Sequence, residues 1–366
     1  MRRCIELALL GAANVAPNPM VGAVLVHNNR IIGEGWHQQF GAPHAEVNCM
    51  NSVVETDIPL IPGSTLYVSL EPCTHFGKTP PCSDLIIQKK ISKVIIGCRD
   101  LFEEVNGKGI EKLKNAGIEV INGVLEEECK ELNKRFFTFH TKQRPYIILK
   151  WAQTADGKIA ADGKQRLLIS NEYTNHLVHQ WRSEEAAILV GTNTALLDNP
   201  SLTNRLWTGK NPVRMVLDMS LRLPSHLKLF NQQQRTIVFN GLKQEENENV
   251  LYSQINPDND INQQILDVSY KLKLQSILVE GGTKLLQSFI AKGLWDEARI
   301  ISNEELVISN GLAAPSLNNH PVKTEKIYSD TIRYYTNKPV NKKTKPPTNV
   351  LSHRKRYIHQ LPHTCF

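Results

Sequence analysis

The residues with the clearest chemical potential are one histidine, one glutamate and two cysteines in the first third of the chain. His44 is followed by Ala45 and Glu46, and Cys73 and Cys82 each follow a proline. One imidazole and two thiolates can hold a tetrahedral Zn²⁺ and leave its fourth position open, as catalytic zinc requires. Such a metal lowers the pKa of bound water enough to supply hydroxide near neutral pH. Glu46, two residues past the histidine, can move a proton without ligating the metal. A metal-activated water and a nearby carboxylate are suited to displacing ammonia from an amidine-like ring carbon.

Two other interpretations of these residues stay open at this point. His44 and Glu46 can be an ordinary helix start, with the cysteines as small buried hydrophobic side chains. A structural zinc site is also conceivable, but it wants four protein ligands and the sequence shows no fourth. The remaining cysteines have no ligand spacing, and we expect all five to be free thiols: Cys4, Cys49, Cys98, Cys129 and Cys365.

Strand-like and helix-like segments alternate around the proposed metal ligands, which predicts an α/β sandwich with a mixed sheet. Asn28-Asn29 lies between two β-rich runs and suits a hairpin turn, because Asn tolerates positive φ. We expect helices over 2–13, 43–54, 82–90, 109–116 and 125–137, and strands over 21–27, 30–36, 65–70, 93–98 and 118–121.

A second alternating set follows the polar segment His140–Pro145, which we interpret as the domain boundary. Residues 241–262 are rich in Asn, Gln and Glu, and we expect a surface excursion there. After Tyr335 the apolar periodicity stops. We expect domains over 1–143 and 144–337 and a basic, disordered tail over 338–366. In the second domain we expect strands near 146–151, 186–191, 213–218, 235–240, 276–280 and 297–302, and helices near 171–182, 260–273 and 282–292.

Length, composition and charge exclude several classes of protein. A chain of 366 residues has room for two domains, at roughly 100–200 residues each. Its ordinary composition argues against disordered, collagenous or disulfide-rich proteins. No apolar run approaches the roughly 18 residues of a membrane-spanning helix, and the N-terminus lacks a secretory h-region, so we expect a cytoplasmic protein with no membrane partner. Seven of the 43 basic residues lie in the tail; without them the body carries 36, equal to its 36 acidic residues.

The first domain resembles the cytidine-deaminase superfamily, whose signature is H-x-E followed by P-C-x-x-C. Here eight residues separate Cys73 from Cys82, in the segment LEPCTHFGKTPPC, and N-P-M-V-G-A-V begins at Asn18. Both segments are similar to the riboflavin-biosynthesis pyrimidine deaminase, in which the long gap contacts the substrate phosphate. The resemblance covers nearly all of 1–140. It implies a three-layer α/β/α domain with one Zn²⁺ per chain, and it places Asn18, His37, Lys78 and Asp100 in the substrate pocket.

Lys78 is the plausible phosphate anchor among these, because an exposed ammonium stands there in a Gly-Lys-Thr turn. The loop that starts at Asp100 departs from the family pattern, since it lacks the proline-rich D-P-x-P form.

The second domain carries four motifs in the order found in the companion reductase of the same pathway. They are Leu149–Gly157 (LKWAQTADG), Gly191–Thr194, Asp198–Arg205 and Val279–Gly282. The last of these motifs, Val279–Gly282, is the end of a β-rich run that enters a helix through two glycines. By itself, this pattern suggests only a turn open to a phosphate at the helix N-terminus. The reductase family resembles dihydrofolate reductase in fold and uses NADPH to reduce a ribosyl group to ribityl. The matched positions run through most of 146–303.

The resemblance assigns roles position by position. Substrate-binding positions are Lys150, Arg166, Arg182, Leu202, Arg205 and Glu280. NADPH-binding positions are Gln153, Leu168, Thr194, Asp198, Gly282, Thr283, Lys284, Leu285, Leu286, Gln287 and Ser288. The two matched guanidiniums Arg182 and Arg205 suit the substrate phosphate, because each can bind two oxygens at once, and Lys150 can protonate an alkoxide that forms as hydride arrives. The family's Trp-Ile-Thr is Leu168-Ile-Ser here, and its Ser-Leu-Asp-Gly is Thr154-Ala-Asp-Gly.

We therefore expect a fused deaminase and reductase that acts on phosphorylated pyrimidine ribotides, as a homo-oligomer and without a nucleic-acid partner. A deaminase of free nucleosides or RNA, with a non-catalytic second domain, is the alternative enzyme. A zinc-stabilised nucleic-acid-binding protein, suggested by the basic tail, is the alternative from another class. It predicts a salt-dependent affinity for RNA or DNA that is lost when 338–366 are deleted.

Overall fold

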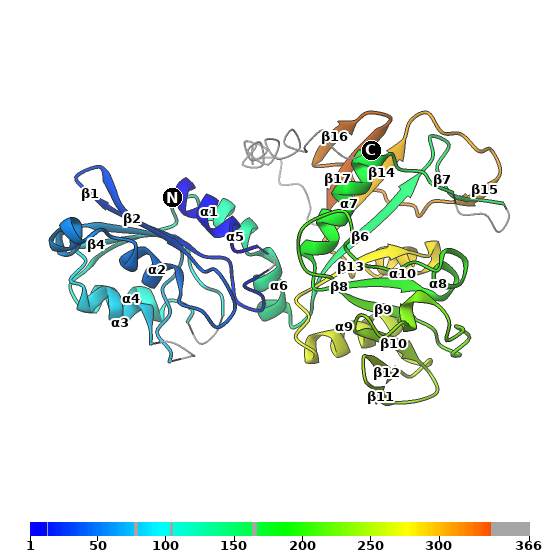
Figure 1. The fold of residues 1–366 in the computed structure, drawn as a ribbon, viewed down its shortest axis with the longest axis horizontal. Helices are drawn as coiled ribbons and strands as arrows, with labels where there is room; N and C mark the ends of the chain where they lie inside the picture. Colours follow the sequence, from blue (N-terminus) through cyan, green and yellow to red (C-terminus); the bar gives the residue numbers. More distant parts are fainter. Residues whose placement is uncertain (13, 77–79, 103–104, 163–166, 338–366) are drawn as a thin grey trace.

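The computed structural model describes residues 1–337, except 13, 77–79, 103–104 and 163–166. The predicted site residues Lys78 and Arg166, and the predicted tail 338–366, therefore lie outside the described residues. The chain forms two lobes joined by helix α6 (Lys134–Lys142) (Figure 1). Among the described helices none has the length and the apolar character needed to cross a membrane.

The first lobe is built on a five-stranded mixed sheet in the order β2-β1-β3-β4-β5. The outer hairpin turns at Asn28 and Asn29, both with positive φ as predicted. Strand β1 pairs antiparallel with β3, and β4 and β5 continue the sheet in parallel. The strands are β1 (Gly22–His27), β2 (Arg30–Trp36), β3 (Thr65–Leu70), β4 (Lys93–Cys98) and β5 (Glu119–Asn122).

Helices cover both faces of this sheet, which gives the predicted three layers (Figure 1). Helices α1 (Arg2–Leu9) and α5 (Glu126–Leu132) lie on one face, and α2 (Ala45–Asn51), α3 (Cys82–Gln88) and α4 (Lys108–Asn115) lie on the other. A 3-10 helix, Glu55–Gly63, leads into β3. Gly35 of β2 allows α2 to approach closely, since a Cβ there would lie 2.2 Å from the backbone nitrogen of Cys49.

The second lobe is built on a ten-stranded sheet, so the predicted class of two α/β domains with mixed sheets is confirmed. The order is β11-β12-β10-β9-β8-β13-β6-β14-β17-β16, and β7 pairs with β15 in a separate ribbon. The strands are β6 (Tyr146–Gln153), β7 (Lys158–Ala161), β8 (Ala187–Gly191), β9 (Val213–Leu217), β10 (Thr236–Asn240), β11 (Glu245–Asn247), β12 (Val250–Gln254), β13 (Ser276–Gly281), β14 (Glu297–Asn303), β15 (Gly311–Ala313), β16 (Lys323–Ile327) and β17 (Asp330–Thr336).

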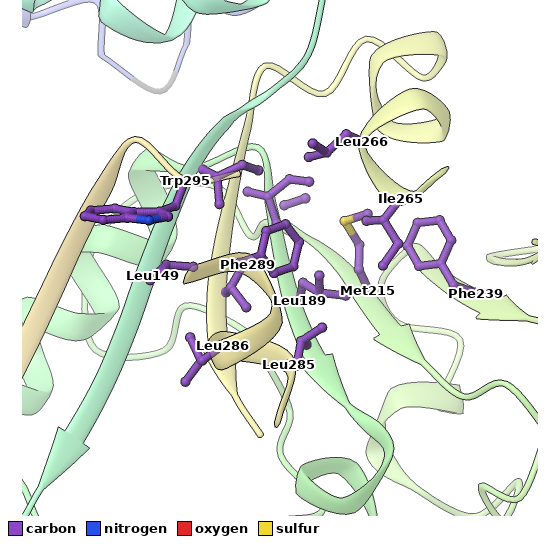
Figure 2. Packing of buried hydrophobic residues seen from close by; sticks show 14 of the residues in the cluster. Leu149, Leu189, Met215, Phe239, Ile265, Leu266, Leu285, Leu286, Phe289 and Trp295 are labelled. Atoms are coloured by element: carbon purple, nitrogen blue, oxygen red, sulfur yellow. The ribbon is translucent and has the colours of Figure 1, made fainter. Parts of the chain in front are cut away.

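Alternating side chains of the central strands enter two cores, one on each face. On one face, Leu149 packs with Leu286 and Phe289 (Figure 2) in a cluster that also includes residues of α9 (Ile261–Lys271) and α10 (Thr283–Ala291). On the other face, Ile148 packs with Trp181 of α7 (Glu172–Glu184). Helix α8 (Thr192–Asp198) contacts β8 and β9, and a 3-10 turn spans Lys228–Phe230. Because Lys150 follows Ile148 by two residues, it belongs to the face that α7 covers.

Two sequence predictions are wrong in detail, and some strands were not predicted. Residues 241–262 are not only a surface excursion, because β12 pairs parallel to β10 and buries Val250 and Leu251. The predicted helix 125–137 is two helices, and it breaks at Asn133, whose side chain binds Met20 instead of facing solvent. The strands β15, β16 and β17, beyond the last predicted one, complete the sheet edge and the ribbon.

Buried ion pairs join α6 to the second lobe. Lys134 Nζ lies 2.8 Å from a carboxylate oxygen of Glu297, and Arg135 Nε donates to Glu185 at 2.8 Å. Both carboxylates are buried. Removing one partner of such a pair leaves an uncompensated charge, which costs about 3–5 kcal/mol. These pairs therefore fix the lobes relative to one another.

Candidate functional site

The three predicted metal ligands converge at one end of the first lobe. His44 is the N-cap of α2, Cys73 follows β3 after a proline, and Cys82 is the first residue of α3. Their ligand atoms all lie within 4.8 Å of one another. Within the part of the chain that the structure describes, no other three His, Cys, Asp or Glu side chains gather in this way. The structure thus brings together the ligands that the sequence placed 29 and 38 residues apart.

The separations of these ligand atoms fit a tetrahedral zinc ion. His44 Nδ1 is 3.3 Å from Cys82 Sγ and 3.6 Å from Cys73 Sγ. Zinc–sulfur and zinc–nitrogen bonds at a tetrahedral angle would separate the two atoms by about 3.6 Å. Hydrogen bonds from the Cys82 thiol and from His44 hold the pKa of the Cys73 thiol well below its usual range. The donor set therefore fits Zn²⁺, with Nδ1 as the imidazole ligand atom.

Glu46 lies beside the ligands in the first turn of α2, as predicted. It is only 3% exposed, and its carboxyl group interacts with the Cys82 thiol. Burial raises the pKa of Glu46, and the nearby Cys73 sulfur raises it further. A carboxyl group whose charged form is disfavoured can hold a proton and release it, which suits general acid–base chemistry.

Two predicted pocket residues stand next to the metal ligands. Asn18 Nδ2 is 3.1 Å from His37 Nε2, and His37 Nδ1 is 3.1 Å from the carbonyl oxygen of Pro43. Since a carbonyl only accepts, Nδ1 of His37 carries the proton and Nε2 accepts from the amide of Asn18. Burial lowers the pKa of His37, which keeps the ring neutral. Its ring meets the ring of His44 edge-on at 5.4 Å, so this pair lines the metal centre.

Asp100, the third described pocket residue, starts the loop after β4. Its side chain is buried and accepts a hydrogen bond from the backbone N–H of Phe102 at 2.9 Å. Burial raises the pKa of Asp100 to about 6. This loop depends on a residue to which the sequence assigned no role. The carboxylate of Glu71, in the LEPC segment, accepts four backbone N–H groups, those of Asp100, Gly107, Gly109 and Ile110.

In the second lobe, three predicted substrate positions form a compact charged cluster. Glu280, near the end of β13, accepts two hydrogen bonds from Arg182 of α7, at 2.8 and 2.6 Å. Lys150 Nζ of β6 lies 3.8 Å from the same carboxylate. Burial disfavours the charge, but Arg182 and Lys150 outweigh it and lower the pKa of Glu280 to about 2. The carboxylate therefore stays ionised and fixes both cations.

Arg205 joins this cluster through the loop that follows α8. Arg205 donates to the Thr203 hydroxyl at 2.9 Å, and Arg182 reaches the Thr203 carbonyl at 3.4 Å, so both guanidiniums meet at one residue. The loop is anchored by His179, whose Nδ1 accepts the backbone N–H of Arg205 at 2.9 Å. Leu202 lies in the same loop, with a buried side chain and a φ of 51°.

Part of the predicted cofactor set lies at the glycine turn between β13 and α10. Gly282 has a φ of 85°, which favours glycine, and a Cβ on Gly281 would lie 3.0 Å from the side chain of Thr194. The first N–H groups of α10 have no partner within the helix and point out of its N-terminus. A phosphate or other anionic group of a nucleotide fits such a turn.

The other predicted cofactor residues are spread more widely. Leu285 and Leu286 point into the core (Figure 2), so only their backbone can contact a ligand. Thr283 and Lys284 form the first turn of α10, and Ser288, further along the helix, binds Asn262 of α9 at 3.0 Å. Four predicted positions remain. Gln153 accepts from Trp151 at 2.9 Å, Gln287 accepts from the backbone N–H of Ser316 at 2.9 Å, Asp198 ends α8, and Leu168 is 76% exposed.

Sequence reasoning missed the positioning residues Glu71, Asn133 and His179. Glu71 belongs to the LEPC segment, and His179 precedes Arg182 by one helical turn, so the sequence could have indicated both residues. Nothing in the local sequence marks Asn133, because its partner Met20 is 113 residues away.

Comparisons with known proteins agree with both halves of this geometry. Residues 1–98 match the cytidine and deoxycytidylate deaminase zinc-binding region, and residues 145–305 match the RibD C-terminal domain. The riboflavin biosynthesis protein RibD of Aquifex aeolicus is 42% identical over 81% of this chain and 83% of its own length. The RibD protein of Synechocystis is 38% identical over 86% of each chain.

Solved structures give the same result over the whole fold. A diaminohydroxyphosphoribosylaminopyrimidine deaminase/5-amino-6-(5-phosphoribosylamino)uracil reductase from Thermotoga maritima superposes with a TM-score of 0.83 at 39% identity, over 92% of this chain and 97% of that one. RibD from Acinetobacter baumannii also has a TM-score of 0.83, at 29% identity and the same coverage.

Proposed function

The chain belongs to the RibD family of bifunctional riboflavin-biosynthesis deaminase–reductases, and from that premise we propose which substrates and residues its two sites use. The deaminase substrate is 2,5-diamino-6-(5-phosphoribosylamino)pyrimidin-4-one. The reductase then converts the ribosyl side chain of the deaminated product to ribityl with NADPH. The observation that carries the proposal is that each lobe assembles its own site: a zinc ligand set beside a buried glutamate, and a cation cluster beside a glycine turn.

In the deaminase site, His44, Cys73 and Cys82 would hold the zinc ion. Bound Zn²⁺ would lower the pKa of water and so supply the nucleophile for the ring carbon. The Glu46 carboxylate accepts the proton that the water loses and passes it to the amino nitrogen, which leaves as ammonia. The neutral His37 ring and the Asn18 amide present fixed polar groups to the substrate, and Lys78 is the proposed phosphate anchor.

In the reductase site, NADPH would supply the hydride, and the turn at Gly282 with Thr194 would hold its phosphates. Lys150 donates a proton to the ribose oxygen that gains charge in the reaction. Glu280 holds Lys150 and Arg182 in place. The cations of Lys150, Arg182 and Arg205 together with the Glu280 carboxylate give this site a net charge of about +2. This charge matches a phosphate of charge about −1.5 to −2.

The test separates the two reactions. With the zinc-loaded Glu46→Gln variant, we expect ammonia release to fall about 10²- to 10⁴-fold with zinc content unchanged, because only the proton transfer is lost. NADPH oxidation with the deaminated ribotide should stay at the wild-type rate. Glu55→Gln is the matched control, since Glu55 is exposed on the same lobe. Full ammonia release by Glu46→Gln would contradict the deaminase assignment.

The reductase assignment has its own test. Lys150→Met should fold like the wild type and abolish NADPH oxidation. Ammonia release should stay intact, because the two sites lie in separate lobes. NADPH oxidation at the wild-type rate in this variant would contradict the role of Lys150.

The remaining features of the proposal concern the setting of the enzyme. All six cysteines in the described residues are unpaired, which agrees with a reducing compartment such as the cytoplasm. We retain 143/144 as the domain boundary, and a homo-oligomer stays a prediction that light scattering of the purified chain would test.

A further inference from the structure

The segment that carries Asn18 into the deaminase site is held from outside by two amide side chains. The side chain of Asn133, between α5 and α6, accepts the N–H of Met20 at 2.8 Å and donates to its carbonyl at 2.9 Å. The carbonyl of Pro17 accepts a hydrogen bond from Gln275 Nε2 at 2.6 Å. The segment is thus braced on both sides of Asn18.

Gln275 belongs to the other lobe. It directly precedes β13, and its backbone carbonyl accepts the N–H of Tyr146 at 2.9 Å, which fixes it where the central strands β13 and β6 begin. Its side chain is only 6% exposed. The ion pair of Lys134 with Glu297 crosses the same boundary and keeps the two lobes in register. The reductase lobe therefore places a buried donor against the segment that carries Asn18.

We propose that Gln275 is a positioning residue for the deaminase reaction, so that the reductase lobe completes the substrate pocket of the deaminase lobe. The contact runs from Gln275 to Pro17, whose neighbour Asn18 donates to His37 Nε2. His37 in turn bonds Pro43 and lies against the metal ligand His44. This inference rests on the proposed function, because it takes Asn18 and His37 as substrate-binding groups.

The hydrogen bond from Gln275 to Pro17 should affect substrate binding more than the rate of the deamination step. The metal ligands and Glu46 lie at the starts of α2 and α3 and just after β3, and within the described residues the hydrogen bonds recorded for Gln275 go to Pro17 and Tyr146. The Asn18 segment lies between α1 and β1, where short turns such as that from the N–H of Asn18 to Val15 provide its backbone hydrogen bonds. Loss of the bond to Pro17 allows the Asn18 amide to move away from His37, while the metal centre keeps its geometry.

The test uses the full-length, zinc-loaded enzyme. Gln275→Met keeps the length of the side chain and removes its donor. We expect the KM for the diaminopyrimidine ribotide to rise about 2- to 10-fold, as for the loss of one neutral hydrogen bond, with kcat for ammonia release changed less than 2-fold. Zinc content and the KM and kcat of NADPH-dependent reduction should stay at wild-type values. Calorimetric titration of the ribotide into the Glu46→Gln enzyme, with and without Gln275→Met, should show the same rise in Kd without turnover.

Two further variants sharpen the test. Gln263→Met makes the same chemical change on α9, where Gln263 binds Asp267 on the surface, and it should leave both reactions unchanged. Gln275→Glu turns the donor into an acceptor facing the Pro17 carbonyl and should raise the deaminase KM at least as much as Gln275→Met.

Three results would overturn the inference. Unchanged deaminase KM in both Gln275 variants would show that the contact does not position the pocket. A parallel loss of reductase activity in both would show that Gln275 only maintains the fold of its own lobe. Wild-type enzyme that releases no ammonia would overturn the proposed function itself, and the inference with it.

Discussion

The carboxylate of Glu71 makes the loop after β4 depend on a single side chain. One oxygen accepts the N–H groups of Asp100 and Gly107 at 3.2 and 3.0 Å, and the other accepts those of Gly109 and Ile110 at 2.9 and 3.1 Å. Glu71 is 4% exposed, so water does not readily replace it. We predict that Glu71→Gln strongly destabilises the deaminase lobe.

The magnitude follows from the division of the four bonds between two oxygens. The glutamine amide keeps one oxygen and therefore one pair of N–H acceptor contacts, while its NH₂ group faces the other pair. Each lost hydrogen bond to a charged group is worth about 1.5–3 kcal/mol, so two lost bonds reduce the free energy of unfolding by about 3–6 kcal/mol. That is a large part of the 5–15 kcal/mol typical of a domain.

Differential scanning calorimetry of the full chain measures this effect. At about 2–4 °C for each kcal/mol, the loss of about 3–6 kcal/mol should move the transition of the first lobe down by about 6–24 °C. The transition of the second lobe should move much less. At 25 °C, kcat/KM for ammonia release should also fall, because Asp100 starts the same loop.

Glu119→Gln is the matched control, because its carboxylate is 61% exposed and pairs only with Lys93 among the recorded ion pairs of the described residues. We expect its melting temperature within about 1–2 °C of wild type, since such surface changes stay within about 0.5 kcal/mol. If Glu71→Gln behaves like this control in both melting and ammonia release, the carboxylate is not what holds the loop.

Three further predictions concern the metal and the reductase cluster. A zinc chelator should abolish ammonia release and leave NADPH oxidation with the deaminated ribotide unchanged; parallel loss of both would show that the metal also supports the second lobe. Because Arg182 and Lys150 hold the pKa of Glu280 at about 2, below its ordinary value of 4.5, the stability that Glu280 contributes is present above pH 4.5 and is lost as the pH falls from 4.5 toward 2. Chemical unfolding across this range should show that loss in the wild type and a weaker dependence in Glu280→Gln. His179→Ala removes the acceptor for the Arg205 N–H and should raise the reductase KM about tenfold, while the melting temperature of the first lobe stays unchanged. His179→Asn should give an intermediate KM. Equal KM values in the wild type and both variants would contradict the anchoring role.

The pH response of His179 follows from the same cluster. Burial and the neighbouring Arg182 and Arg205 lower the pKa of His179 to about 4. Its ring therefore stays neutral near neutral pH, so the hydrogen bond that anchors the loop of Arg205 does not titrate there.

Local sequence patterns predicted much of the fold. The strands Thr65–Leu70 and Lys93–Cys98 end where predicted, because a continuous apolar run between polar turns has few alternatives to a buried strand. Patterns were weaker where burial depends on a distant partner. Strand β12 looked like part of a polar surface segment, and only pairing with β10 buries it. Asn133 breaks a helix that propensity would continue, because its amide binds Met20.

By itself, the sequence determined the chemistry of the two sites. His44, Cys73 and Cys82 form a possible zinc ligand set, and Glu46 adds a carboxyl group able to carry a proton; their types and order are readable without coordinates. The same holds for Lys150, the guanidiniums and the glycine pair, since charge, reach and backbone freedom belong to the residue type.

Only the tertiary structure decided how these groups are held. Glu71 takes its four N–H donors from the loop after β4 and the first turn of α4, 29 to 39 residues away, and Gln275 reaches Pro17 across 258 residues and a lobe boundary. Such contacts leave no periodic pattern in the sequence, because they join segments that are far apart along the chain and meet only in the tertiary structure. The residue types that can bind the metal can therefore be read from the sequence, whereas the contacts that hold the segments around them depend on the folded structure.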